Sequence, residues 1–219
     1  MTTPLQKVRS HESLTSQVVA SLRAAIVAGD MAAGEKHSVG SIAAQLGVSR
    51  TPVREAVLQL AKLGLVEILK NQGFVVVERD DNEVLRIFQI RRWLEVPAAG
   101  LAAASADEAA KARIRSMYDR MLEAAHAADH AALERYDARF HSAVLDAVGN
   151  PRLTQIVDEL RDLLITRQHT TTERSRGMID IAHDHDGILG AIEAGDPQRA
   201  EREMAQHLDL TRDGVIAIL

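Results

Sequence analysis

The sequence predicts a mainly α-helical protein built from two parts, and three observations lead to this prediction. Apolar residues recur at helical spacing along most of the 219 residues. Two short β-rich segments, 65–69 and 74–77, flank a turn. Beyond residue 82 alanine is abundant, aromatic residues are few and no alternating pattern follows. We therefore expect a small domain at residues 1–77, a charged linker at 78–82 and an all-α antiparallel six-helix bundle at 83–219.

Composition limits the class of protein. The chain has no cysteine, which excludes disulfides and thiolate metal sites. No apolar run has membrane-spanning length and residues 1–10 lack a signal-peptide pattern, so we expect a cytoplasmic protein without a membrane partner. The net charge of −5 is unevenly distributed. Residues 1–80 carry 9 Lys and Arg against 7 Asp and Glu, and residues 81–219 carry 17 against 24, which fits a DNA-binding head on an acidic body.

The head begins with two amphipathic helices. The first has Ser13 as a candidate N-cap and ends near residues 29–30; its apolar positions are Leu14, Val18, Leu22, Ala25 and Ile26. Residues 31–38 lead into a short second helix, which Gly47 can end; its apolar positions are Ile42, Ala43 and Leu46. The segment after Gly47 is therefore the start of a third helix.

The third helix carries the residues that point to DNA. Thr51 can cap it, and Pro52 suits its first turn. Arg50 and Arg54 fall off its apolar stripe, near the helix N-terminus; the stripe consists of Val53, Val57, Leu60 and Ala61. Such a helix fits the major groove of B-DNA, where arginine can donate two hydrogen bonds to guanine or bind phosphate. On spacing alone, an ordinary helical hairpin with two solvated arginines is an equal alternative.

A β-hairpin directly after this helix favours the DNA-binding alternative. Gly64 can end the helix, and residues 70–73 form the turn between the two strands, so the pattern is a winged helix-turn-helix. The stretch GVSRTPVREAVLQLAKLGLVE, followed by NQGFVVV, resembles the N-terminal domain of GntR-family transcription regulators. The resemblance implies operator contacts by the third helix, and a wing-tip glycine, Gly73, in the minor groove; the helix residues are Ser49, Arg50, Thr51 and Arg54.

Six helices are predicted after the linker, at about 83–104, 107–128, 130–148, 151–170, 178–194 and 197–217. A capping box at residues 105–108 opens the second helix. Residues 149–151 separate the third from the fourth, and residues 175–177 precede the fifth. Asp196 can cap the sixth helix, which starts at Pro197.

Four polar residues lie on inward, apolar stripes of three of these helices. Asp137 and His141 are one helical turn apart within the stripe of the third helix. His185 lies on the stripe of the fifth helix and His207 on that of the sixth. One carboxylate and three imidazoles suit a divalent metal ion, zinc first, with manganese or nickel as alternatives.

Each inward histidine has a simpler interpretation as a hydrogen-bonded core residue, and an Asp and a His four residues apart can be a local ion pair. The shared placement of all four residues favours one metal site over four separate explanations. Five of the other histidines lack this placement and are interpreted as surface or structural residues: His11, His126, His130, His169 and His183.

The second part also resembles a known domain. The segments YDARFHSAVLDAVGNPRL and AHDHDGILGAIEAGDPQRAEREMAQH resemble the FCD ligand-binding domain of the FadR branch of the GntR family. The resemblance implies that the four residues named above bind metal, and that Arg91 and Asn150 line an effector pocket. Arg91 or its neighbour Arg92 could instead be a plain surface charge.

Together these observations predict a homodimeric transcription regulator, in the family more commonly a repressor. The head would bind a palindromic, double-stranded DNA operator, and a small carboxylate effector would bind beside the metal. Two other classes remain as alternatives. One is a metal-dependent, hydrolase-like enzyme in which the metal activates water. The other is a metal-stabilised adaptor that binds no DNA, against which the two arginines of the third helix argue.

Overall fold

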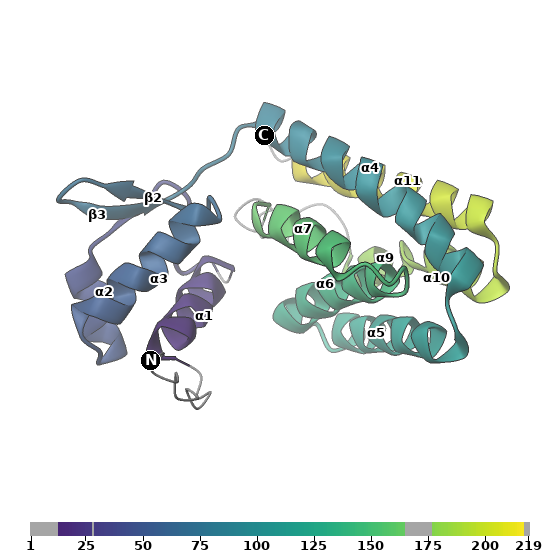
Figure 1. Ribbon diagram of the computed structural model, residues 1–219, viewed down its shortest axis with the longest axis horizontal. Helices are drawn as coiled ribbons and strands as arrows, with labels where there is room; N and C mark the ends of the chain where they lie inside the picture. Colours follow the sequence, from purple (N-terminus) through teal and green to yellow (C-terminus); the bar gives the residue numbers. More distant parts are fainter. Residues whose placement is uncertain (1–12, 28, 165–176, 217–219) are drawn as a thin grey trace, which may run out of the picture. The chain divides into compact units, whose positions relative to one another are not determined.

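The computed structural model describes residues 13–27, 29–164 and 177–216, and the chain divides into two compact units, residues 1–78 and 79–219 (Figure 1). The prediction of a mainly helical chain with a small sheet in its N-terminal part is confirmed. None of the helices in the described part of the chain has the length and apolar composition that a bilayer crossing requires.

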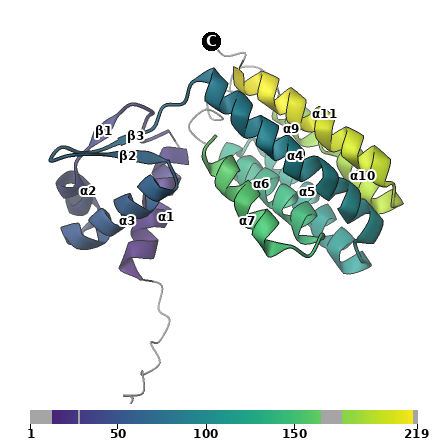
Figure 2. The same cartoon turned by 45° about the horizontal axis from the view of Figure 1, so that its top comes forward.

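The first unit is a three-helix domain with a three-stranded antiparallel sheet. Its helices are α1 (Leu14–Val27), α2 (Val39–Leu46) and α3 (Arg50–Lys62), and its strands are β1 (Lys36–His37), β2 (Val66–Leu69) and β3 (Gly73–Val76). The strand order is β1-β3-β2 (Figure 2). The hairpin of β2 and β3 is the predicted wing, whereas β1 was not predicted because two residues are too few to show an alternating pattern.

The predicted caps of this unit are partly confirmed. The Ser16 amide donates to the Ser13 side chain at 3.0 Å, and Gly47 ends α2 with a left-handed φ of 66°. The prediction that Thr51 caps the third helix is wrong, because α3 begins at Arg50 and Ser49 occupies the N-cap position without a side-chain cap bond. Thr51 therefore lies within the first turn of α3.

The core of the first unit follows the predicted stripes. The third-helix stripe is confirmed at Val53, Val57 and Leu60, whereas Ala61 is only partly buried and Ala56 is buried instead. The buried apolar side chains from the other described elements are Val18, Leu22, Ile26, Met31, Ile42, Ala43, Leu65, Val66, Phe74 and Val76. The N-terminal turn of α3 is thus held on a packed base with its polar side exposed.

The second unit consists of helices packed around a common core. The described helices are α4 (Asp81–Ser105), α5 (Glu108–His126), α6 (His130–Asp146), α7 (Pro151–Asp162), α9 (Met178–His183), α10 (Asp186–Ala194) and α11 (Pro197–Ile216). In both ribbon views α4 lies alongside α11, with α6 and α7 on its other side (Figures 1 and 2). Side chains from α4, α5, α6, α9, α10 and α11 share the main core.

Several predicted helix ends and one predicted helix need correction. The helix predicted over 178–194 is two helices, α9 and α10, with His185 at the break. Asp107, rather than Ser105 of the predicted capping box, caps α5 by accepting from the Ala110 amide at 2.7 Å. Asp80 caps α4, which therefore begins inside the segment predicted as linker. The predicted cap of the last helix is confirmed, because Asp196 accepts from the Arg199 amide at 3.0 Å.

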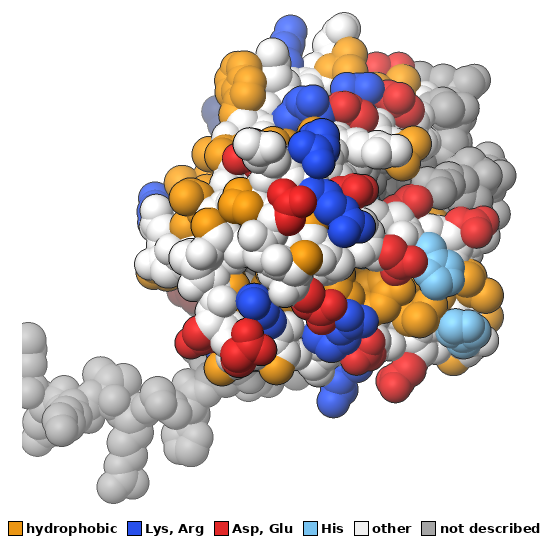
Figure 3. Space-filling model, turned by 90° about the vertical axis from the view of Figure 1, so that its right-hand side faces the viewer, with side chains coloured by type: hydrophobic (Ala, Val, Ile, Leu, Met, Phe, Trp, Pro, Cys, Tyr) orange, Lys and Arg blue, Asp and Glu red, His pale blue; other side chains and the backbone are white. Residues whose placement is uncertain are grey.

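The surface charge of the molecule is mixed on the face that Figure 3 shows. There, Lys and Arg side chains lie among Asp and Glu side chains and do not form a field of one sign. A nucleic acid needs a continuous basic surface, so this face does not have the character of a DNA-binding surface.

Candidate metal centre and nucleic-acid interface

The structure brings together the four predicted metal ligands. Each of Asp137, His141, His185 and His207 offers one ligand atom, and these atoms all lie within 4.8 Å of one another. The three histidines are buried, and Asp137 is partly buried. Four candidate ligands from segments far apart in the sequence therefore converge on one point inside the second unit.

Two helices place three of the four residues by their regular geometry. Asp137 and His141 lie one turn apart on α6, with Phe140 and Val144 of the same helix in the core. His207 lies on α11, between the buried residues Met204 and Leu208. The predicted helical stripes therefore gave the correct inward direction for all three.

The break between α9 and α10 places the fourth ligand and fixes its tautomer. His185 Nδ1 lies 3.1 Å from the Ile181 carbonyl oxygen and 3.3 Å from that of Ala182. A carbonyl only accepts hydrogen bonds, so Nδ1 must carry the hydrogen. In the neutral imidazole Nε2 then holds a lone pair, and this atom lies 3.1 Å from Asp137 Oδ1, which is also an acceptor.

A carboxylate fixes the tautomer of His141 in the same way. His141 Nδ1 donates to Glu95 Oε2 at 2.6 Å, so its Nε2 holds a lone pair. Burial lowers the pKa of His141 to about 4, which keeps this imidazole neutral at pH 7. Its Nε2 lies 3.1 Å from Nε2 of His207. Burial, together with His185 and His141, also holds the pKa of His207 well below its usual range.

These contacts test whether the residues fit a metal ion. Three acceptor atoms converge here: Nε2 of His141, Nε2 of His185 and a carboxylate oxygen of Asp137. With the tautomers given above, none of the three carries a hydrogen that it could donate to another. Buried acceptors that face one another are costly unless a proton or a cation lies among them. A divalent cation satisfies all of them at once, and the hydrogen bonds from Nδ1 are those that orient metal-binding histidines in proteins. The residues present fit the metal.

Sequence reasoning missed two charged residues that support the centre. Glu95 accepts from His141 with one oxygen and from Arg91 Nε, at 2.6 Å, with the other. Burial alone would raise the pKa of Glu95, but Arg91 and His141 outweigh it and hold this pKa below its usual range. Arg161 of α7 donates to Asp137 Oδ2, and its positive charge outweighs burial and holds the pKa of Asp137 well below its usual range. Both carboxylates are therefore ionised.

The sequence did contain a pattern that indicates the burial of Arg91 and Glu95. They are four residues apart and share the inner stripe of α4; its buried apolar members include Val84, Ile87, Phe88, Ala98, Ala99 and Ala102. Two opposite charges on such a stripe indicate a buried, paired network. Arg161 offered no comparable signal, because its partner Asp137 lies 24 residues away.

The two residues predicted to line the effector pocket lie in different environments. Arg91 is buried beside Glu95, whereas its neighbour Arg92 is exposed and pairs with Asp209 on α11. Asn150 is exposed and caps α7 by accepting from the Arg152 amide at 3.2 Å. The geometry thus gives Arg91 a place in the network around the centre and gives Asn150 a capping contact.

The remaining histidines lie outside the cluster. His126, His130 and His183 are exposed, and His183 contacts Asp186 at 3.0 Å. His37 is partly buried against the ring of Phe74. The predictions for His11 and His169 fall outside the described residues.

The candidate nucleic-acid interface lies on the first unit. Ser49, Arg50, Thr51 and Arg54 are all exposed at the N-terminal end of α3, whose other side is buried. The wing turn consists of residues 70–72, all exposed, and Asn71 has a φ of 62°. Gly73 does not lie at the tip but opens β3, paired with Leu69.

A steric constraint within the first unit explains why residue 73 is a glycine. Its φ is 102°, and an added Cβ would lie 2.0 Å from the carbonyl oxygen of His37 in β1. Real Cβ atoms do not approach a backbone atom so closely, so β1 and β3 can pair here only beside a glycine. A DNA contact by Gly73 stays a prediction.

A winged helix-turn-helix followed by a helical domain with a buried polar centre defines the class of DNA-binding transcription regulators. Comparison with known families names the group. Residues 14–76 match bacterial regulatory proteins of the gntR family, and residues 86–210 match the FCD domain. The chain belongs to the GntR family, in its FCD branch.

Individual relatives agree with this assignment. The chain is 34% identical over 167 residues to a probable D-xylose utilization operon transcriptional repressor of Paenarthrobacter nicotinovorans, covering 76% of this chain and 73% of that protein. It is 31% identical over 196 residues to the transcriptional repressor GlaR of Escherichia coli, covering 84% and 87%. The chain is a DNA-binding transcription regulator of this family.

Solved structures share the fold. The structure of Escherichia coli McbR/YncC matches with a TM-score of 0.81 at 24% identity, covering 91% of this chain and 95% of that one. A GntR regulator from Rhodococcus sp. RHA1 matches with a TM-score of 0.75 at 23% identity, covering 93% and 97%. At these identities the likeness shows the fold alone.

Proposed function

We propose that this chain is a homodimeric repressor whose operator binding is modulated by a small carboxylate effector, bound beside a divalent metal ion in the second unit. The observation that carries the proposal is the convergence of Asp137, His141, His185 and His207. Three imidazole nitrogens and one carboxylate oxygen form a ligand set that zinc accepts readily, with manganese or nickel as alternatives. When bound, the metal supplies a Lewis-acidic point to which an effector oxygen can bind.

The charges around the centre support an anionic effector. The buried network holds two guanidinium groups, Arg91 and Arg161, and two carboxylates, Glu95 and Asp137, so its formal charge is zero with neutral histidines. A divalent ion makes this interior positive by two charges, and a buried positive charge favours an anionic ligand. Arg91 Nη1 and Arg161 Nε are buried and have no hydrogen-bond partner among the described residues, so donors for a carboxylate are available.

Two observations favour a regulator over a metal-dependent enzyme. Both oxygens of Glu95 are engaged, by Arg91 and His141. Glu95 is therefore not free to accept a proton from a metal-bound water, as a general base must. The relatives named above are transcription repressors, which also supports repression by this chain.

Regulation requires that the effector bind one arrangement of the dimer more tightly than another. The first test therefore concerns the DNA contact. We expect Arg50→Ala and Arg54→Ala each to weaken operator binding by ~1–3 kcal/mol, as loss of a base or phosphate contact does. Far-UV circular dichroism should not change, because both side chains are exposed. The operator is first obtained by selecting bound sequences from a random DNA library.

Lys62→Ala, at the opposite end of α3, is the matched control and should bind the selected operator like the wild type. Wild-type affinity in folded Arg50→Ala and Arg54→Ala would reject the recognition-helix assignment. The effector part is tested on the same operator, with a panel of small carboxylates added to metal-loaded protein. A carboxylate that shifts operator affinity in wild type, but not in His207→Ala, supports the proposal.

A further inference from the structure

The side chain of Arg50, at the start of α3, lies against a glycine of the neighbouring helix. A Cβ added at Gly40 of α2 would lie 3.5 Å from Nη2, 3.6 Å from Nε and 3.7 Å from Cζ of Arg50. The guanidinium is planar, and three of its atoms at nearly the same distance mean that mainly its flat face is turned toward this position. Arg50 therefore crosses from α3 to α2 and covers the place where another residue would carry its side chain.

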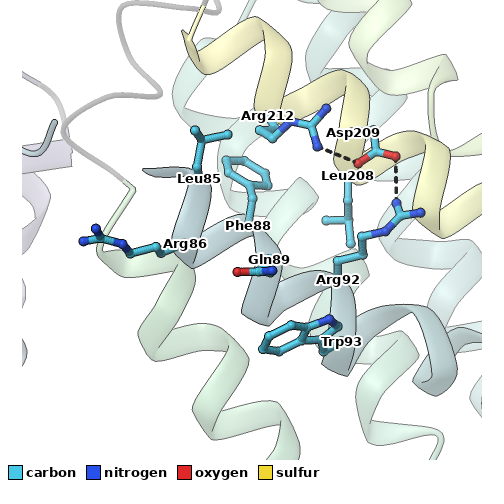
Figure 4. Close-up of a pocket in the computed structure, with 9 residues that line it drawn as sticks. All are labelled: Leu85, Arg86, Phe88, Gln89, Arg92, Trp93, Leu208, Asp209 and Arg212. Carbon is cyan, nitrogen blue, oxygen red and sulfur yellow. Dashed lines mark hydrogen bonds and ion pairs between the residues drawn. The ribbon is translucent and has the colours of Figure 1, made fainter. Parts of the chain in front are cut away.

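The donors of this guanidinium have no partner within the protein. Among the residues that the structure describes, none forms a hydrogen bond or an ion pair with Arg50. Figure 4 shows a contrasting case on the second unit, where Arg92 and Arg212 donate to the two oxygens of Asp209 at 2.7 and 3.0 Å. Because the N–H groups of a guanidinium lie in its plane, a contact through the flat face leaves them available for a ligand.

The backbone of α2 does not require a glycine at position 40. Gly40 is the second residue of this helix and does not have a positive φ. Glycine in a helix is less favourable than alanine, so its presence here has a cost. The contact with Arg50 gives a reason for it. A Cβ alone would be in ordinary van der Waals contact with the guanidinium, whereas a longer side chain would enter the space that the guanidinium occupies.

We propose that Gly40 is a specificity-determining residue for operator recognition, because it lets α2 hold the guanidinium of Arg50 in a fixed plane for a base. The inference rests on the operator contact of Arg50 in the proposed function. To read guanine, two N–H groups of one plane must point at O6 and N7. An arginine whose plane is already fixed loses less conformational freedom on binding. Gly40 is thus a positioning residue that acts through Arg50.

A phosphate contact by Arg50 would have a different consequence. Phosphate contacts orient a protein on DNA and carry no sequence information directly. Loss of such a contact weakens binding to every DNA sequence by a similar factor, whereas loss of a base contact relaxes the preference at one base pair of each half-site. Selection of bound sequences from a random DNA library, with the full-length protein, distinguishes the two.

Gly40→Glu tests the inference by placing a carboxylate beside the guanidinium, which should draw Arg50 away from the DNA. We expect affinity for the wild-type operator to fall by ~10-fold or more, and the preference for one base pair of each half-site to be lost. Arg50→Ala should lose the preference at the same base pair. In the Arg50→Ala background Gly40→Glu has no guanidinium to displace, so its cost should be smaller by ~5-fold or more.

Two other variants serve as controls. Gln45→Glu adds the same charge at an exposed residue near the other end of α2. Its effect on affinity should be the same with and without Arg50, and the base preference should not change. Gly40→Ala is the conservative variant; it should keep the base preference and raise the melting temperature, because alanine is the better helix former. If Gly40→Glu does not fold, Gly40→Asp carries the same test, since a carboxylate suits the first turn of a helix.

The outcomes separate the role of Gly40 from the proposed function. A base preference that is lost in Arg50→Ala but kept in folded Gly40→Glu, or equal costs of Gly40→Glu in both backgrounds, would overturn this role and leave Arg50 as an operator contact. A uniform loss of affinity in Arg50→Ala, with every base preference kept, would assign Arg50 to phosphate and overturn it too. Wild-type binding by Arg50→Ala would also overturn it, and the same result for Arg54→Ala would reject the recognition-helix assignment itself.

Discussion

His183 and His185 are two residues apart and differ in every respect that matters for metal binding. His185 is fully buried with Nε2 beside Asp137, whereas His183 is exposed and pairs with the equally exposed Asp186. We therefore expect His185→Ala to reduce bound metal to a small fraction and His183→Ala to leave it nearly unchanged, because exposed ion pairs contribute little. Elemental analysis of protein purified without added metal measures both.

Thermal unfolding of the same two variants checks that the loss is specific. His185→Ala should unfold at a temperature that no longer responds to added zinc, whereas His183→Ala should respond like the wild type. Equal metal content in both variants would contradict the assignment of His185 as a ligand and the helical register on which it rests.

At the level of single residues, the sequence predicted the clustering of the four candidate ligands but not the residues that support them. Asp137, His141 and His207 interrupt clear apolar stripes, so their inward direction follows from helical periodicity. The bond between Glu95 and His141 joins residues 46 positions apart, and periodicity carries no information on which helices touch. The exposure of Ser49, Arg50 and Arg54 was predictable because the opposite stripe of α3 is regular.

At the level of elements, the break between α9 and α10 has its own support. The Tyr118 hydroxyl of α5 donates to Asp186 Oδ1, and Asp186 is the first residue of α10. Burial and this bond raise the pKa of Tyr118, so its hydroxyl remains a donor. A carboxylate at a helix N-terminus is also favourable for the helix dipole. Tyr118 thus fixes the start of α10, one residue after His185.

We expect Tyr118→Phe to weaken metal binding by ~10-fold, as loss of a group that orients a metal ligand typically does. Tyr136→Phe is the control, because Tyr136 contacts exposed arginines on α5 and α6. Competition with a chelating dye measures the affinity, and the melting temperature of metal-free protein shows whether the fold has changed. A Tyr118→Phe variant with unchanged affinity would mean that the break holds without this bond.

Two glycines of the first unit provide a second test: Gly73 in the wing and Gly47 at the end of α2. Gly47 and Gly73 both have left-handed φ values, of 66° and 102°, but nothing lies within 4 Å of a Cβ added at Gly47. Gly47→Ala should therefore cost only the backbone strain of ~1–2 kcal/mol. Gly73→Ala must also separate β3 from His37 of β1, so it should be more destabilising and should weaken operator binding. Urea unfolding and DNA titration of the two variants measure the difference.

The elements that the sequence failed to predict have a common cause. The apolar residues Ile181, Ile188 and Ile192 keep helical spacing across the break at His185, so no local pattern marks it. Strand β1 exists only because β3 lies beside it, through the pairs Lys36 with Val75 and His37 with Phe74. Both features depend on packing partners remote in sequence, whereas the long helices depend on their own periodicity.

At the level of the whole molecule, the metal should act on one unit and leave the other intact. All four candidate ligands lie in the second unit, and the residues predicted to contact DNA lie in the first. A metal present at ~100 times its dissociation constant adds about 2.7 kcal/mol to the unit that binds it. Chelation should therefore lower the melting temperature by several degrees, and added zinc should restore it.

Operator affinity of the chelated protein should remain at least in part, because the head has its own core. Calcium, which prefers more oxygen ligands than this centre offers, is the control ion and should not restore the melting temperature. Negligible metal content together with an unmoved melting temperature would leave Asp137 and the three histidines as a polar cluster only. The two-part organisation itself was predictable, because the strand pattern ends where the alanine-rich helices begin.

Inserting or deleting a residue in helix α4 would disturb both its buried and its exposed side. The helix starts directly after the first unit, turns Arg91 and Glu95 inward and exposes the side chains of Ile90, Trp93 and Leu101. One residue inserted after Glu95 would rotate everything beyond it by about 100°, since an α-helix has 3.6 residues per turn. Pro97 and Leu101 would then move to the buried positions that Ala98 and Ala102 now occupy, while Gly100 and Ala103 would move to exposed positions. Insertions and deletions should therefore be excluded from α4 and accepted at exposed connections such as residues 127–129, between α5 and α6.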